Sequence, residues 1–176
     1  AQNMGYSFAH NQALVKTNSQ YVLTLNPDVW LDPLFLESMY KRMEATKELG
    51  SVAGCLLRVD SLGDTATRID SMGVQIYRTR RQYLINDNLS VICMKTFPTR
   101  IFGPDGAAAF YRRDMLNDIA VNEEIFDNIF FLHKEDIDIC WRAQLRGWSS
   151  EYVHDAVAHH IRTFRPGKRR NVEKWI

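Results

Sequence analysis

Short apolar runs of strand length alternate with longer amphipathic stretches along this chain. The run Tyr21–Leu25 predicts a buried strand that ends at Asn26-Pro27-Asp28, because proline lacks the N–H that a strand ladder needs. A helix is expected next, with Asp32 as its N-cap and Gly50 just after its last turn. Residues 51–59 are again mostly apolar and predict another strand. This alternation favours an α/β fold.

The second half of the chain continues the alternation. An amphipathic helix is expected to begin at Glu135 and to close at Gly147. The face that we expect it to bury carries Ile137, Cys140, Trp141 and Leu145. The remaining predicted elements are short helices at 9–15 and 112–119, a strand or hairpin within 70–84, and a last strand that starts at Tyr152 and carries His154, His159 and His160. We therefore expect a Rossmann-like, mainly parallel mixed sheet flanked by helices.

Composition narrows the class of protein. The chain has 176 residues, enough for one domain with a sizeable core. Lys plus Arg number 22 and Asp plus Glu 21, so the net charge of +1 argues against a dedicated nucleic-acid binder. The three cysteines lie far apart in sequence, which favours reduced thiols over a disulfide framework. No apolar run approaches the roughly 18 residues that span a bilayer.

Asp28 is the first candidate for chemistry. A carboxylate just past the end of a buried strand lies where open α/β sheets bind their ligands. There it can hold a divalent cation that in turn holds phosphates, since Mg²⁺ often uses one or two carboxylates plus substrate oxygens. The same three residues, Asn26-Pro27-Asp28, are also ordinary turn chemistry, so both interpretations stay open.

Glu135 and Asp136 are the second candidates. Acidic residues are common in the first turn of a helix, where its dipole stabilises negative charge. The apolar segment that precedes this pair can instead raise the pKa of a carboxyl group toward the range of a general base.

The third candidates are His159 and His160, which point to opposite faces of a strand, so that only one of them can face Asp28.

Taken in order, these segments resemble the family 2 glycosyltransferases, in particular the bacterial rhamnosyltransferase-like branch with a GT-A fold. The resemblance covers nearly the whole chain, and its most specific segment is 126–142, which contains Glu135 and Asp136. The other matching segments are 3–11, 21–28, Asp70-Ser71-Met72-Gly73 and 103–108, with Gly147-Trp148 closing the set.

The resemblance implies an inverting sugar transfer from a nucleoside-diphosphate donor. It implies that Asp28 and His160 bind Mg²⁺ or Mn²⁺, with His159 a weaker metal ligand. It implies that Asp136 is the general base and that Glu135 helps to place the acceptor. The further residues that it assigns to donor or acceptor binding are Asn3, Gly5, Asn11, Asn26, Gly106, Ala107 and Arg142. Asn26 stands where the family's metal motif has its first acid, which leaves one carboxylate for the cation.

The same resemblance suggests a biological setting. The branch favours dTDP-rhamnose as donor and a cell-surface polysaccharide or lipid-linked glycan as acceptor. The expected place is the cytoplasm, at the inner face of the cell membrane, with peripheral membrane contact through basic residues near the C-terminus. We expect residues 1–165 to be the C-terminal portion of one GT-A domain, without the family's nucleotide-binding first half. Residues 166–176 are then a basic tail or the start of an extension.

Two other functions remain open at this point. One is a carbohydrate-binding or interaction module that keeps the fold without catalysis. The presence of Asp28, Glu135 and Asp136 together speaks against it. The other is a metal-dependent hydrolase built on Asp28 and the histidines. It is weakened because the chain lacks the close His-Xaa-His or His-Glu spacing of common metal sites.

Overall fold

A computed structural model describes residues 3–61, 63–92 and 99–161 of the chain. The tail predicted at 166–176 and Cys93 lie outside these residues, whereas Cys55 and Cys140 are buried free thiols. The described helices are α1 (Tyr6–Leu14), α2 (Phe35–Ala45), α3 (Arg113–Asp118) and α4 (Glu135–Leu145). The described strands are β1 (Tyr21–Leu25), β2 (Val29–Leu31), β3 (Leu49–Val59), β4 (Arg68–Ser71), β5 (Val74–Ile76), β6 (Gln82–Leu84), β7 (Arg100–Ile101), β8 (Ala108–Arg112) and β9 (Ser149–Ile161).

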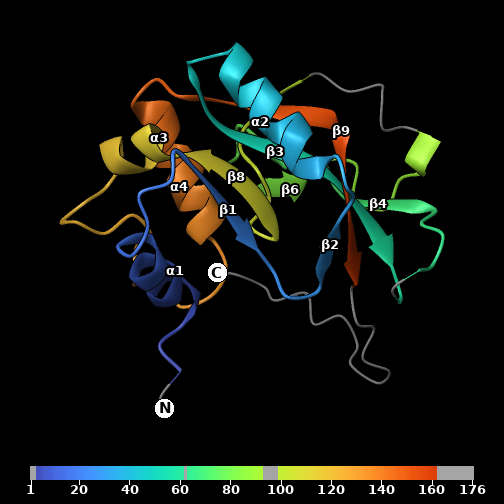
Figure 1. Cartoon of the computed structure of the whole chain (residues 1–176), viewed down its shortest axis with the longest axis horizontal. Helices are drawn as coiled ribbons and strands as arrows, with labels where there is room; N and C mark the ends of the chain where they lie inside the picture. Colours follow the sequence, from blue (N-terminus) through green and yellow to red (C-terminus); the bar gives the residue numbers. More distant parts are fainter. Residues whose placement is uncertain (1–2, 62, 93–98, 162–176) are drawn as a thin grey trace.

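A central sheet organises the fold (Figure 1). Its strand order is β1-β8-β3-β9-β2, with β4 paired to β3 and β7 paired to β9, while β5 and β6 form a separate hairpin. The predicted mixed α/β class is confirmed. The expectation of a mainly parallel sheet is not: β3 and β9 run parallel, and the other pairs among the described strands are antiparallel. An apolar run such as Tyr21–Leu25 indicates burial but carries no information on strand direction.

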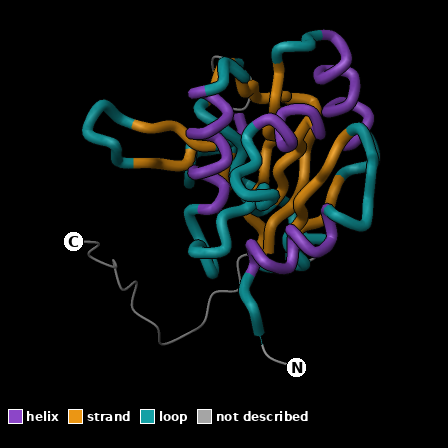
Figure 2. Tube along the Cα trace, turned by 90° about the vertical axis from the view of Figure 1, so that its left-hand side faces the viewer, coloured by secondary structure: helices purple, strands orange, loops and turns teal. Residues whose placement is uncertain are grey.

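Helices cover both faces of the sheet, as Figure 2 shows from the side. Alternate residues of β8 face opposite sides, so Phe110 packs in the cluster beneath α2 and Tyr111 in the cluster beneath α3 and α4. On the α2 side, Phe35, Met39 and Met43 are fully buried against the sheet. These apolar layers hold the strand ends, and the polar side chains beyond them, in fixed positions.

The structure corrects the predicted ends of α2. Asp32 is not its N-cap: the helix begins at Phe35, and the Asp32 carboxylate lies 3.1 Å from His159 Nε2. Gly50 does not end the helix but lies within β3, since α2 stops at Ala45. A Cβ at position 50 would lie 2.6 Å from Met115 Cγ, so the glycine permits close packing against α3. Gly50 is therefore required by close packing of β3 against α3 and does not mark the end of a helix.

The buried face of α4 also differs from the prediction. The helix buries Ile139, Cys140 and Ala143, whereas Trp141 is 40% exposed and Leu145 is 76% exposed. Small residues at the contact determine how α4 is rotated about its own axis, and hence which of its faces is buried. A Cβ on Gly103 would lie 2.0 Å from Cys140 Sγ, so α4 approaches the strand-connecting segment at a point where no larger side chain fits.

Candidate active site

The fold gathers the predicted functional segments at one end of the sheet (Figure 1). Antiparallel pairing places the end of β1 beside the start of β8, and parallel pairing places the ends of β3 and β9 together. Two backbone hydrogen bonds hold the segment after β1. The Asn26 N–H donates to the Ala107 carbonyl at 2.9 Å, and the Ile161 N–H donates to the Asp28 backbone carbonyl at 2.9 Å. The segment 26–28 therefore joins the start of β8 to the end of β9.

Asp136 lies over the start of β8. Lys134, with a left-handed φ of 76°, turns the chain into α4 and places Asp136 in its first turn. Its Oδ2 accepts a hydrogen bond from the Gly106 N–H at 3.1 Å, and its Oδ1 accepts one from the Ile137 N–H at 2.8 Å. A carboxylate oxygen can accept more than one hydrogen bond, so the group is oriented by the backbone and still able to take a proton.

Burial makes both acids of the pair better bases. Burial raises the pKa of Asp136, and the nearby Asp105 carboxylate raises it further, against a smaller lowering by the backbone N–H donors. Burial also raises the pKa of Glu135, with Asp136 adding to the effect. Glu135 Oε2 is buried and has no hydrogen-bond partner among the described residues. An orphaned buried oxygen is costly in free energy, which points to a ligand donor at this position.

Tyr6 and Asp105 join this cluster, and sequence reasoning assigned no role to either. The Tyr6 hydroxyl donates to the Gly106 carbonyl at 3.1 Å, and burial raises the pKa of Tyr6 to about 12, so it stays a neutral donor. Asp105 Oδ1 accepts from the Ala107 N–H at 2.9 Å. Both residues lie inside segments singled out from the sequence, but only the fold shows that they flank Asp136.

His160, rather than His159, faces Asp28. Residue Val29 of β2 pairs with His160 of β9, which brings the imidazole Nε2 to 3.4 Å from Asp28 Oδ1. His159 points to the other face, where it meets Asp32. The prediction that the two histidines diverge is confirmed, and the buried one shares the edge with Asp28.

Asp28 and His160 fit a divalent cation that is bound partly by a substrate. The half-buried carboxylate and the imidazole nitrogen are ligands that such cations accept. Within 3–61, 63–92 and 99–161, no group of three or more His, Cys, Asp or Glu side chains is arranged to hold a metal ion alone. The remaining ligands must then come from water or from phosphate oxygens, as is usual for Mg²⁺.

The N-terminal residues predicted to bind the donor support the segment before α4. Asn3 Oδ1 accepts from the Gly5 N–H at 3.0 Å, and a Cβ at Gly5 would lie 2.7 Å from the Phe131 carbonyl oxygen. Asn11 holds both polar backbone atoms of Phe126, donating to its carbonyl at 2.7 Å and accepting from its N–H at 2.9 Å. These contacts fix the entry into α4, and direct donor contacts by the same residues stay a prediction.

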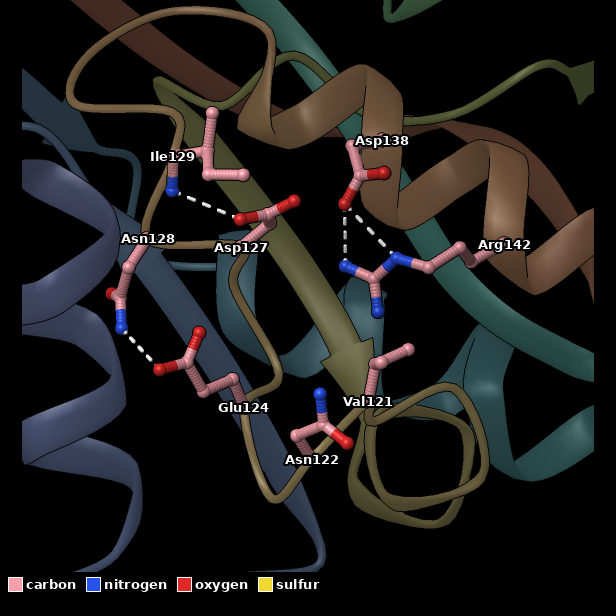
Figure 3. Close-up of a pocket in the computed structure, with 8 residues that line it drawn as sticks. All are labelled: Val121, Asn122, Glu124, Asp127, Asn128, Ile129, Asp138 and Arg142. Carbon is pink, nitrogen blue, oxygen red and sulfur yellow. Dashed lines mark hydrogen bonds and ion pairs between the residues drawn. The ribbon is translucent and has the colours of Figure 1, made fainter.

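Arg142 lines a separate pocket of about 590 Å³ on another side of α4 (Figure 3). Its guanidinium is bound to Asp138 at 2.6 Å and donates to the carbonyls of Ile119 and Ile125. Asp138 lines this pocket and Asp136 does not, because residues two positions apart on a helix point about 200° apart. Arg142 therefore ties α4 to the preceding segment, and its predicted contact with a substrate stays a prediction.

Comparison with known proteins identifies the family. The sequence model described as "Glycosyl transferase family 2" matches residues 1–120, more than half of the chain. The chain belongs to this family. No curated protein sequence matches it. Among solved structures, the family 2 chain is similar to the crystal structure of GalNAc-T7 with UDP, GalNAc and Mn²⁺, with a TM-score of 0.63 and 12% sequence identity.

That similarity covers 92% of the family 2 chain and 31% of the GalNAc-T7 chain, so this chain spans about a third of the length of that protein. At 12% identity the likeness shows a shared fold, which is the predicted GT-A architecture. The family match contains Asp28 and Gly106, while Asp136 and His160 lie beyond residue 120. Their assignment therefore depends on the geometry described above. Separately, no described helix is long and apolar enough to cross a membrane.

Proposed function

We propose that this family 2 protein is an inverting glycosyltransferase that moves a sugar from a nucleoside-diphosphate donor to a hydroxyl of a glycan or lipid-linked acceptor. The observation that supports it most directly is the pair Glu135 and Asp136: two acids with raised pKa values, one of which has a buried oxygen in need of a donor. Carboxyl groups whose pKa is raised by burial are typical of catalytic acids and bases, which favours a transferase over a module that only binds carbohydrate.

In the proposed reaction, Asp136 takes the proton from the acceptor hydroxyl. The acceptor oxygen then forms a bond to the anomeric carbon, and the bond from that carbon to the phosphate oxygen breaks. The nucleoside diphosphate leaves with the electron pair. The Gly106 and Ile137 N–H groups keep the Asp136 carboxylate oriented, and Glu135 accepts a second hydrogen bond from the acceptor through its buried oxygen.

Asp28 and His160 would hold Mg²⁺ or Mn²⁺ at the donor diphosphate. When bound, the cation neutralises the charge that develops on the leaving group. Support comes from the ligand pair at the end of the sheet and from the Mn²⁺ and UDP in the GalNAc-T7 structure. Asp28→Ala should weaken metal-dependent donor binding, and Asp136→Asn should leave it intact.

The finer assignment rests on the resemblance of the sequence motifs to the rhamnosyltransferase-like branch. It comprises dTDP-rhamnose as donor, synthesis of cell-surface polysaccharide, and a cytoplasmic location at the inner face of the membrane. A panel of nucleotide sugars, offered to the full-length protein with Mn²⁺ and lipid-linked glycan acceptors, tests both levels. Transfer from dTDP-rhamnose alone supports the finer assignment. Transfer from another donor contradicts the rhamnose assignment and keeps the transferase. Donor cleavage without any acceptor would favour a hydrolase instead.

A further inference from the structure

Three charged side chains, those of Asp70, Arg58 and Asp87, lie in series behind His160, and the proposed reaction gives none of them a role. His160 Nδ1 lies 2.8 Å from Asp70 Oδ2, on the side of the ring opposite to Asp28. Arg58 Nη2 lies 2.7 Å from the other Asp70 oxygen and 2.8 Å from Asp87 Oδ1. These contacts lead from Asp87, which is exposed, through Arg58, Asp70 and His160 to Asp28.

Burial of this series makes its geometry specific. The Asp70 side chain is fully buried and that of His160 is 6% exposed. The Asp70 carboxylate is compensated on one oxygen by the Arg58 Nε and Nη2 donors, at 3.0 and 2.7 Å, and on the other by the imidazole. Removing either compensation would leave a buried charge, so the arrangement fixes all three side chains together.

The sheet is locally modified to present Asp70 in this way. Leu57 pairs with Ile69 and Leu56 with Ser71, so Asp70 is the extra residue of a β-bulge in β4. Bulges re-aim a side chain at the edges of sheets and beside active sites. The parallel neighbours Arg58 and His160 lie in register on β3 and β9. Three strands thus direct one carboxylate to one imidazole nitrogen.

This geometry determines where the imidazole proton lies. A carboxylate paired with a guanidinium accepts hydrogen bonds and donates none, so Nδ1 of His160 carries the proton toward Asp70. In the neutral ring Nε2 then has a lone pair, and it faces Asp28 Oδ1 at 3.4 Å. Two electron-pair donors at that separation can act as neighbouring ligands of one cation whose ligand distances are about 2.1 Å.

We propose that Asp70, held by Arg58, is a positioning residue that fixes the tautomer and the orientation of His160 so that Nε2 is available to a divalent cation. The inference rests on the proposed function, which supplies the cation and the diphosphate. It gives a role to the Asp70-Ser71-Met72-Gly73 segment, which the sequence singled out but the reaction did not require. Hydrogen-bonded partners of this kind commonly change metal affinity by about 10- to 100-fold.

Two measurements on the full-length protein test the inference. ¹⁵N-histidine NMR at about pH 8.5, two units above the ordinary histidine pKa, reports which nitrogen of His160 carries the proton. The His160 signal is the one absent from His160→Gln. Titration with Mn²⁺ alone, followed by the EPR signal of the free ion, gives the dissociation constant. Asp87→Asn is the matched control, because Asp87 contacts the same Arg58 but not the histidine.

The expected result is a proton on Nδ1 in the wild type. Asp70→Asn is expected to move it to Nε2 and to raise the Mn²⁺ dissociation constant about 10- to 100-fold. Asp87→Asn should keep the tautomer and change the constant by less than about twofold, as befits an exposed ion pair. A wild-type proton on Nε2 overturns the inference without any Asp70 variant, so the test holds even if Asp70→Asn fails to fold. A folded Asp70→Asn with unchanged tautomer and affinity also overturns it.

The same data separate this inference from the proposed function. If the wild type binds no Mn²⁺ even when a nucleoside diphosphate is added to supply phosphate oxygens, the metal-dependent donor site of the proposed function is contradicted. The tautomer of His160 then still supports or overturns the positioning role of Asp70, since it is a property of the chain alone.

Discussion

Replacing the Asp136 carboxylate by an amide is the sharpest test of the proposed reaction. Asp136→Asn keeps the size and shape of the side chain but removes its ability to take a proton. The amide oxygen can still accept from the Gly106 N–H or from the Ile137 N–H, so one of the two backbone contacts survives. Loss of the other costs about 1 kcal/mol of stability. Removal of a half-buried charge acts in the opposite direction, so we expect the variant to fold.

The expected kinetic effect is much larger than the structural one. General base catalysis contributes about 10²- to 10⁴-fold to a rate. At about 1.4 kcal/mol for each factor of ten, its loss raises the barrier by about 3 to 5 kcal/mol. The donor diphosphate is assigned to Asp28 and His160 at the end of β9, so the KM for the donor should change little. The effect should therefore fall on kcat.

Single-turnover transfer from a radiolabelled donor measures this effect directly. Asp114→Asn is the matched control, since Asp114 is also an acid in the first turn of a helix but lies exposed on α3. We expect it to transfer at the wild-type rate. If Asp136→Asn retained more than about a tenth of wild-type kcat while donor binding was unchanged, Asp136 could not be the general base.

Three further predictions follow from packing and charge. Gly103→Ala should destabilise the fold by about 1 to 3 kcal/mol in urea unfolding, because its Cβ would meet Cys140 Sγ at 2.0 Å, whereas Gly106→Ala, with its nearest atom at 3.4 Å, should be near neutral. Met39→Ala should cost about 2 to 5 kcal/mol in the same assay, since the Met39 side chain of α2 is fully buried against the sheet. Because burial raises the pKa of Asp136 above its unfolded value, its contribution to stability is present at low pH and is lost as the pH rises through the folded pKa. Asp136→Asn should therefore gain stability relative to the wild type as the pH rises from the ordinary aspartate pKa of about 3.9 toward the raised folded pKa, and a difference in melting temperature that stays constant over this rise would contradict the burial argument.

Local patterns predicted the elements of this fold better than their packing. The strand Tyr21–Leu25 has the predicted bounds, because an apolar run stopped by proline leaves little choice. Gly50 misled because a glycine that ends a helix and a glycine that admits a neighbouring side chain look alike in sequence. The rotation of α4 was likewise missed, since its apolar positions cover more than one face and only the tertiary contact with Gly103 selects among them.

For the candidate site, sequence reasoning found the acids and the histidines but not what orients them. Asp136 stands out because it lies in the first turn of a helix that follows an apolar segment, and His160 because it lies in the last predicted strand. Tyr6 carries no such signal, since it reaches Gly106 across a hundred residues of sequence. Long-range contacts of this kind depend on strand register, which no local pattern states.

Asp70 shows most clearly how the fold adds chemistry to the sequence. As a residue of a buried strand edge it would be an unfavourable choice, because a buried charge costs free energy unless it is compensated. The compensation comes from Arg58 on β3 and from His160 on β9, which lie side by side only because those strands are parallel and in register. The parallel pairing of β3 and β9 therefore places the Arg58 guanidinium and the His160 imidazole on the same Asp70 carboxylate. A one-residue shift between the two strands would turn the imidazole to the other face and separate it from Asp28 as well. The register that builds the core is therefore also what assembles the candidate metal site.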